Sequence, residues 1–328
     1  MAVLRWGIIG PGRISTRIVR ALASSSRGTL AAVASRDPAR AAAYATQHGV
    51  GRSFGSYDSL LASSEIDVVY IALPNHLHAE WTIRALEAGK HVLCEKPLAL
   101  TVDEVDAIQA VAQRTGRIAA EAFMYLHHPQ IRRVLELARD GTLGPLELVR
   151  GTFSILLSAP DDPRIDPAMG AGSLWDVGCY PVSFARRLAG EEPDRVAAFA
   201  RLDERGVDRT FIGQLHFPGG LLAQFDSGFR ASDRESLEVV GQAGRLVLES
   251  PFVPAPDGPR PVVTLWRGRA HERINVPSVD QYHAEVEDLI GAILDGTPPR
   301  VSLDFSRGTI ATLVDLDRAA RSGQQAEL

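Results

Sequence analysis

The stretch VLRWGIIGPGRIS, residues 3–15, decides the fold. Its first seven residues are mainly apolar and predict a short buried strand, and a helical pattern of apolar residues follows it. Between strand and helix, Gly10-Pro11-Gly12-Arg13-Ile14-Ser15 resembles the glycine-rich turn that binds a dinucleotide pyrophosphate. Gly10 permits the tight turn, Gly12 lets the main chain approach the phosphates, and the small Ser15 lets the helix pack closely. The stretch therefore predicts a dinucleotide site at a helix N-terminus.

Strand and helix patterns alternate over the first 120 residues. Apolar strands at 30–34, 66–73 and 91–94 are each followed by a helical pattern, and residues 118–120 give a last small strand. Thr101 and Glu104 form a capping box that opens one of the helices. This succession predicts a Rossmann domain over residues 1–122, with a doubly wound parallel sheet.

The end of the second strand indicates which dinucleotide binds. Enzymes that use NAD usually place Asp or Glu there, against the ribose 2′-hydroxyl. Here Ser35 and Arg36 occupy that place. A hydroxyl and a guanidinium suit a 2′-phosphate, so NADP is the expected cofactor and NAD the alternative. Asp37 is interpreted as the cap of the following helix, which has Pro38 at its first position.

Polar residues follow the carboxyl ends of later strands, where open α/β sheets bind ligands. One strand leads into Pro74 and Asn75, and the next ends at Cys94-Glu95-Lys96-Pro97. A buried lysine is costly unless it is paired or used, so Lys96 is predicted to be catalytic; the alternative is an exposed loop lysine. The expected cofactor-binding residues are Gly10, Pro11, Gly12, Arg13, Ile14, Ser35, Arg36, Leu73, Pro74, Asn75, His78, Glu95, Lys96 and Pro97.

The pattern changes from residue 123 onward. After a helix at 129–138, several strands are joined by short glycine-containing turns such as 218–220 and 242–244, which indicates an antiparallel sheet. Two helices at 282–294 and 304–321 complete the chain. Residues 123–328 are therefore predicted to form an α+β domain with an open, largely antiparallel sheet. Some of its strands carry apolar residues on both faces, which predicts a homodimer through the open face, with a tetramer as the alternative.

The stretch GAGSLWDVGCYP, residues 170–181, carries a second set of chemical groups. Asp176 and Tyr180 are four residues apart at the start of a helix predicted over 173–188, so both face one way. A carboxylate and a phenol near a lysine can act as general acid and general base. A lysine ammonium would favour the phenolate and lower the pKa of the tyrosine. We expect Tyr180 to be the general acid/base, Lys96 to hold the phenolate and the substrate oxygen, and Asp176 to orient hydroxyls. The structural alternatives are a helix-terminal acid and a core aromatic.

Composition excludes several other classes of protein. The net charge of −5 and pI of about 6.0 argue against a nucleic-acid partner, which needs a basic patch. No apolar run approaches the ~18 residues of a membrane span, and no signal-peptide pattern begins the chain, so a cytoplasmic protein is expected. The only cysteines, Cys94 and Cys179, imply no disulfide framework. His127 and His128 lack metal-ligand spacing, so no metal site is predicted.

Three motifs together resemble those of the Gfo/Idh/MocA oxidoreductase family, and the resemblance covers essentially the whole chain. They are Gly10-x-Gly12, Glu95-Lys96-Pro97 and the run from Gly172 through Asp176 to Tyr180. Residues 6–10, 121–130 and 176–181 are most similar to the branch of dimeric dihydrodiol dehydrogenase and NADP-dependent D-xylose dehydrogenase. The resemblance implies a catalytic Lys96, a cis bond before Pro97, and sugar or cyclic polyol substrates. It also predicts a substrate site made of Lys96, Tyr125, Trp175, Asp176 and Tyr180. Pro11 and Leu126 depart from the family pattern and could change ligand contacts.

The predicted activity is hydride transfer between NADP and a carbinol or carbonyl of a sugar or cyclic diol. Oxidation of a pyranose at its anomeric carbon and reduction of a keto-sugar are both open. Two further alternatives are an enzyme with a tightly held cofactor and a catalytically silent cofactor-sensing regulator. Ring-hydroxyl readout is expected in a polar loop at residues 158–171.

Overall fold

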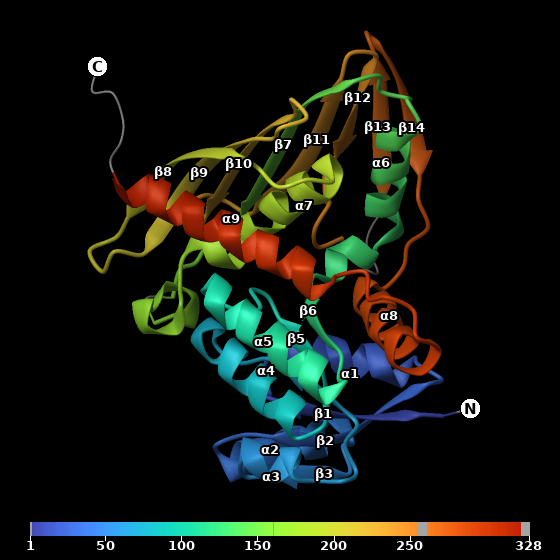
Figure 1. Cartoon of the computed structure of the whole chain (residues 1–328), viewed down its shortest axis with the longest axis vertical. Helices are drawn as coiled ribbons and strands as arrows, with labels where there is room; N and C mark the ends of the chain where they lie inside the picture. The colour runs from blue at the N-terminus through green and yellow to red at the C-terminus, as the bar shows by residue number, and fades with distance from the viewer. Residues whose placement is uncertain (1, 160, 255–260, 323–328) are drawn as a thin grey trace. The chain divides into compact units, whose positions relative to one another are not determined.

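The computed structural model describes residues 2–159, 161–254 and 261–322 (Figure 1). They form two compact units. The first comprises the residues up to His127 together with Asp280–Arg307, and the second comprises His128–Val279 with the residues from Gly308 onward. Residues 280–307 therefore fold with the first unit. The domain boundary predicted from the sequence lies between residues 122 and 123 and assigns residues 280–307 to the second domain.

The first unit contains a six-stranded parallel sheet in the order β3-β2-β1-β4-β5-β6. This order is typical of dinucleotide-binding sheets, in which the crevice lies between the first strand and the fourth. The predicted Rossmann fold is confirmed, with one short strand that the sequence pattern did not indicate, β3. The strands are β1 (Leu4–Ile9), β2 (Gly28–Ala34), β3 (Arg52–Phe54), β4 (Val68–Ile71), β5 (His91–Glu95) and β6 (Ala119–Ala122).

Helices cover this parallel sheet and exclude water from its central strands. All four residues of β4 are fully buried, as expected of a strand covered on both faces. Gly28 of β2 leaves room for Ile290 of α8, since a Cβ there would lie 2.9 Å from the Ile290 Cδ1. The helices of the unit are α1 (Ser15–Ala23), α2 (Pro38–His48), α3 (Tyr57–Leu61), α4 (His78–Glu87), α5 (Val102–Thr115) and α8 (Gln281–Asp295).

The second unit is built on an eight-stranded sheet in the order β14-β13-β12-β11-β7-β10-β9-β8. All neighbours are antiparallel except β7 and β10, which are parallel. The prediction of a largely antiparallel sheet is confirmed, and the parallel pair is the exception that it missed. The strands are β7 (Leu146–Ser154), β8 (Arg195–Leu202), β9 (Asp208–His216), β10 (Leu222–Gly228), β11 (Arg234–Gly241), β12 (Gly244–Leu248), β13 (Val262–Arg267) and β14 (Ala270–Asn275).

Helices pack on one face of this sheet. α7 (Cys179–Ala189) contacts β7 and β10, and α6 (Pro129–Arg139) contacts β13. Glycines in the strands allow close approach: a Cβ at Gly151 would lie 2.5 Å from the Pro181 Cβ, and one at Gly213 would lie 3.1 Å from Leu316 of α9 (Leu303–Ser322). In the part of the chain that the structure describes, no helix is long and apolar enough to cross a membrane.

Candidate active site

The glycine-rich loop joins β1 to α1 and has the geometry that a pyrophosphate requires. Gly10 has φ of 87°, and a Cβ there would lie 2.5 Å from the Ala72 carbonyl oxygen, so only glycine fits. A Cβ at Gly12 would meet no atom closer than the Gly10 oxygen at 4.0 Å, so this side of the loop is open. The Ser15 hydroxyl donates to the Gly12 carbonyl at 2.8 Å and accepts from its N–H at 2.9 Å. The loop is therefore pinned at its helix end, and its residues fit a dinucleotide phosphate.

The end of β2 carries the groups expected at the 2′ position of the ribose. Ser35 is buried and Arg36 exposed. The interpretation of Asp37 as a helix cap is confirmed, because its carboxylate accepts from the N–H groups of Ala39 and Arg40. Arg40, which the sequence reasoning missed, donates from its guanidinium to the Pro11 carbonyl at 2.5 Å. The sequence feature that could have identified Arg40 is its position in the first turn of α2, four residues after Arg36.

Lys96 stands in a turn that is held on several sides. The Lys96–Pro97 bond is cis, as the resemblance implied. The Tyr70 hydroxyl donates to Glu95 Oε1 at 2.5 Å, and Glu121 Oε1 accepts from the N–H of Leu98 at 2.9 Å. Burial, and then the charge of Glu95, raise the pKa of Tyr70 well above its usual value, so its phenol stays protonated and remains the donor. The turn thus has a fixed backbone next to the predicted catalytic residue.

His78 also braces this turn. It is 1% exposed, and its two ring nitrogens each lie 2.7 Å from a main-chain carbonyl oxygen, those of Pro97 and Leu73. Burial, the largest influence, lowers the pKa of His78, the two carbonyls act in the opposite direction, and the charge of Lys96 lowers it further. The ring thus connects the two loops that follow β4 and β5. This geometry supports a role for His78 in holding both cofactor-side loops.

The chain's lysine usage singles out Lys96. Of the 35 Lys and Arg residues, only Lys90 and Lys96 are lysines. The Lys90 ammonium donates to the carbonyls of Ser63 and Ile66 at 2.6 and 2.8 Å, a structural use of its charge. Where the chain needs only a surface cation it uses arginine. Position 96 therefore supplies a compact ammonium, a point charge that differs from the planar guanidinium of arginine.

Asp176 and Tyr180 lie in the second unit, on a segment of unusual geometry. The helix predicted over 173–188 is in fact a π-helix at Leu174–Gly178 followed by α7. Such single π turns often occur at functional sites. The Tyr180 side chain is nearly buried, with its ring centroid 5.2 Å from that of Phe153 and 5.4 Å from that of Phe252. Trp175 and Asp176 are half-buried.

Arg164 is a further charged group near this segment that the sequence reasoning did not single out. Its guanidinium donates to both carboxylate oxygens of Asp162, at 2.9 and 2.7 Å. The Asp162 hydrogen bond raises the pKa of Arg164, burial lowers it, and the charge of Asp176 raises it further. The Arg164 carbonyl accepts from the N–H of Gly172 at 3.1 Å, which joins the polar loop to the π-helix segment. Residue 160 of that loop lies outside the described residues.

The predicted site residues divide between the two units. Lys96 and the expected cofactor-binding residues belong to the first unit, as does Tyr125, whose fully buried ring makes a T-shaped contact with Phe123 at 6.0 Å. Trp175, Asp176 and Tyr180 belong to the second. Within the first unit, the loops after β1, β4 and β5 follow the carboxyl ends of strands in one parallel sheet.

Comparison with known proteins identifies the family. A model described as "Oxidoreductase family, NAD-binding Rossmann fold" matches residues 4–123, and one for the GFO/IDH/MocA C-terminal domain matches residues 131–247. The chain is 38% identical over 328 residues to a D-xylose 1-dehydrogenase (NADP(+)) of Haloferax volcanii, covering 99% of this chain and 100% of that protein. The chain belongs to the Gfo/Idh/MocA oxidoreductase family. The resemblance drawn from the motifs is thereby confirmed.

Other members of this Gfo/Idh/MocA family differ in the reactions their names describe. A trans-1,2-dihydrobenzene-1,2-diol dehydrogenase of Bos taurus is 33% identical over 252 residues, covering 76% of this chain and 75% of that protein. A crystal structure of a 3-ketoreductase from Actinomadura kijaniata, in complex with NADP and TDP-benzene, superposes with a TM-score of 0.92. It is 33% identical and covers 97% of this chain and 98% of that one. The family thus includes both dehydrogenases and a reductase.

Proposed function

We propose that the protein is an NADP-dependent oxidoreductase that transfers a hydride between nicotinamide and a carbinol or carbonyl carbon of a sugar or cyclic polyol. One observation carries the proposal. The glycine loop after β1 and Lys96 after β5 follow carboxyl ends of strands in one parallel sheet, the edge where such sheets bind dinucleotides. The NADP-dependent xylose dehydrogenase among the relatives supports it.

The cofactor would be held by the first unit. The main chain at residues 10–14 and the N-terminus of α1 suit its pyrophosphate, and residues 73–75, His78 and 95–97 line the same sheet edge. Ser35, Arg36 and the newly identified Arg40 would bind the 2′-phosphate, because guanidinium groups pair well with phosphate oxygens. When bound, the nicotinamide supplies or accepts the hydride.

The chain's own residues would handle the proton. As the hydride leaves a carbinol carbon, the hydroxyl proton must also leave, and Tyr180 accepts it as general base. The Lys96 ammonium stabilises the tyrosine phenolate and the developing negative charge on the substrate oxygen. Asp176 accepts hydrogen bonds from substrate hydroxyls and orients the ring. In the reduction direction, Tyr180 returns the proton to the carbonyl oxygen.

The charge of the polar loop favours an uncharged sugar as the substrate. Residues 158–171 contain three aspartates and one arginine, and that arginine is already paired with Asp162. A sugar linked to a nucleotide diphosphate would meet net negative charge there. Reduction of a keto-sugar is the second candidate reaction, favoured by the structural similarity to the 3-ketoreductase. It would use the same residues in the opposite direction.

A substrate panel tests the proposed function. Aldoses, inositols and dihydrodiols are supplied with NADP, and NADPH formation is followed by absorbance; keto-sugars are supplied with NADPH. We expect turnover with at least one neutral sugar or diol, and a higher kcat/KM with NADP than with NAD. Comparable kcat/KM values for the two cofactors contradict the NADP assignment, and no turnover in either direction contradicts the oxidoreductase function. Cofactor that stays bound through purification would identify a tight-cofactor enzyme.

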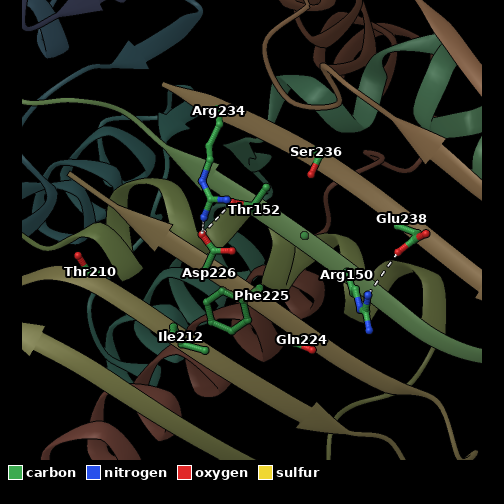
Figure 2. A pocket seen from close by; sticks show the side chains of 11 residues that line it. Arg150, Thr152, Thr210, Ile212, Gln224, Phe225, Asp226, Arg234, Ser236 and Glu238 are labelled. Atoms are coloured by element: carbon green, nitrogen blue, oxygen red, sulfur yellow. Dashed lines mark hydrogen bonds and ion pairs between the residues drawn. The ribbon is translucent and has the colours of Figure 1, made fainter. Parts of the chain in front are cut away.

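The open face of the eight-stranded sheet supports a homodimer as the working form. Phe199 of β8 and Ile212 of β9 are cross-strand partners, yet they are 56% and 46% exposed. Ile212 also lines a cavity of about 410 Å³, whose other lining residues come from the same four neighbouring strands, β11, β7, β10 and β9. Figure 2 shows two ion pairs in it, Arg150 with Glu238 and Arg234 with Asp226. A second copy related by a two-fold axis presents the same apolar residues and the same acidic and basic side chains. The two faces can therefore pack on each other.

Sedimentation at micromolar concentration tests the dimer. Wild type is expected to sediment as a dimer, and a variant with Phe199→Glu and Ile212→Glu as a monomer, because two carboxylates would be buried without partners. Leu156→Glu is the matched control, since Leu156 is 58% exposed but lies beyond the end of β7. A monomeric wild type, or a dimer that survives both substitutions, contradicts the proposal.

A further inference from the structure

The segment that carries Asp176 lacks its own helix cap. The π-helix at Leu174–Gly178 begins after Ser173, whose side chain makes no capping hydrogen bond to the helix. The first N–H groups of a helix need acceptors from elsewhere. Here the acceptor comes from a residue 35 positions later in the chain, Asp208, the first residue of β9.

Asp208 binds both the side chain and the main chain at the start of this segment. Its Oδ2 accepts from the Ser173 hydroxyl at 2.6 Å and from the Leu174 N–H at 2.9 Å. Asp208 is 2% exposed and Ser173 is fully buried. A buried carboxylate with two donors fixes their positions tightly, because charge-assisted hydrogen bonds are short and strong.

The fit around this carboxylate leaves no room for adjustment. Gly172 has φ of 130°, and a Cβ there would lie 2.0 Å from the Asp208 Oδ1. At the other end of the π-helix, a Cβ at Gly178 would lie 3.0 Å from the Ser227 hydroxyl, which itself lies 3.1 Å from the Ser173 hydroxyl. Both ends of the segment are therefore fitted to neighbouring strands, β9 and β10.

From these contacts we propose that Asp208 is a positioning residue, which clamps residues 172–178 to the sheet and thereby sets where Asp176 and Tyr180 point. The proposal rests on the proposed function for its catalytic consequence. Asp208 acts on this segment through Ser173 and Leu174. Tyr180 is the second residue of α7, which continues the π-helix, so rotation of the clamped segment would displace the phenol with the carboxylate. A displacement of about 1 Å can lower turnover about 100-fold.

Asp203 provides a matched control five residues away. Its Oδ1 also accepts from two main-chain N–H groups, those of Arg205 and Val207, at 3.0 and 3.1 Å. These bonds lie in the turn between β8 and β9 and not at the π-helix. Loss of the Asp203 carboxylate removes comparable hydrogen bonds from the same sheet, so it reports the effect of a purely structural defect.

The experiment compares Asp208→Ala, Asp208→Asn, Ser173→Ala and Asp203→Ala in the full-length protein. For Asp208→Ala we expect kcat to fall about 100-fold, while the dissociation constant for NADP changes less than about twofold. Asp208→Asn keeps an acceptor oxygen and should restore most of kcat, and Ser173→Ala should lie between them. Asp203→Ala should keep the wild-type kcat. If Asp208→Ala does not fold, Asp208→Asn and Ser173→Ala carry the test.

Amide hydrogen exchange gives a readout that is independent of turnover. Asp208→Ala is expected to speed exchange at residues 172–180 selectively, and Asp203→Ala is not. Unchanged exchange at 172–180, or faster exchange with the wild-type kcat, overturns the positioning role. Equal losses of kcat in Asp208→Ala and Asp203→Ala also overturn it. If wild type turns over nothing in the substrate panel, the proposed function fails, and exchange at 172–180 alone decides whether the clamp exists.

Discussion

Replacement of Tyr70 by phenylalanine isolates the hydrogen bond that holds Glu95 beside Lys96. The ring of Tyr70 is fully buried, so phenylalanine keeps its volume and leaves no cavity. What disappears is the bond from the hydroxyl to Glu95 Oε1, 2.5 Å long. Because the acceptor is a carboxylate, this bond contributes about 1.5–3 kcal/mol. The free energy of unfolding should fall by about that amount.

The same substitution should slow catalysis. Glu95 Oε2 accepts from the main-chain N–H of Lys96 at 3.3 Å, so a Glu95 side chain that has lost the Tyr70 hydrogen bond holds the backbone of the predicted catalytic residue less firmly. If the activation free energy rises by the full contribution of this hydrogen bond, kcat falls about 10- to 100-fold. Affinity for NADP should fall less than kcat, because Arg36 and the glycine loop are untouched.

The assay measures kcat and KM for the best substrate, NADP affinity by fluorescence titration, and stability by urea denaturation. Tyr57→Phe is the matched control: Tyr57 is 6% exposed, and its hydroxyl makes no hydrogen bond within the described part of the chain. Tyr57→Phe should leave kcat unchanged. A Tyr70→Phe enzyme with kcat within about twofold of wild type and unchanged stability would refute the reasoning.

Three further substitutions test other parts of the account. Arg40→Ala should raise the KM for NADP about 10-fold, because one guanidinium–phosphate bond is lost. The KM for NAD should rise less, because only the Arg40 hydrogen bond to the Pro11 carbonyl is then missing, and steady-state kinetics with both cofactors measure the difference. Gly172→Ala should lower kcat as Asp208→Ala does, because the new Cβ would collide with the carboxylate; wild-type kcat would contradict it. His128 Nδ1 accepts from the Gln130 N–H, and burial lowers the pKa of His128 to about 4. The unfolded state therefore binds more protons between pH 6.5 and 4, so stability decreases as the pH is lowered through that window. His128→Asn, which can still cap α6, should make the urea midpoint depend less on pH there.

Local patterns predicted much of the fold. The glycine loop, the capping box at Thr101 and Glu104, and the cap at Asp37 are all present, because each is decided by residues a few positions apart. The parallel sheet followed from its apolar strands and alternating helices. The turns at 218–220 and 242–244 likewise predicted antiparallel neighbours, which the structure confirms for β9 with β10 and for β11 with β12.

Contacts between distant residues were beyond such reasoning. The parallel pairing of β7 and β10 joins strands about 75 positions apart, and no turn signal announces it. α8 was predicted as a helix, but nothing local shows that it packs in the first unit.

The supporting residues of the site were missed for the same reason. Lys96, Asp176 and Tyr180 stand out as chemical groups in short motifs. Tyr70 and Asp208 instead look like ordinary strand residues in the sequence. Their roles depend on partners, Glu95 and Ser173, that lie 25 and 35 positions away.

The central claim is that Lys96 and Tyr180 act on the same substrate oxygen. It is tested most directly by the kcat of Lys96→Met, Tyr180→Phe and the double variant, on the best substrate with saturating NADP. The account predicts large losses in each single variant and a double variant little slower than the worse single one, as expected of groups that act as a unit. Wild-type kcat in either single variant, with folding and NADP affinity intact, would contradict it.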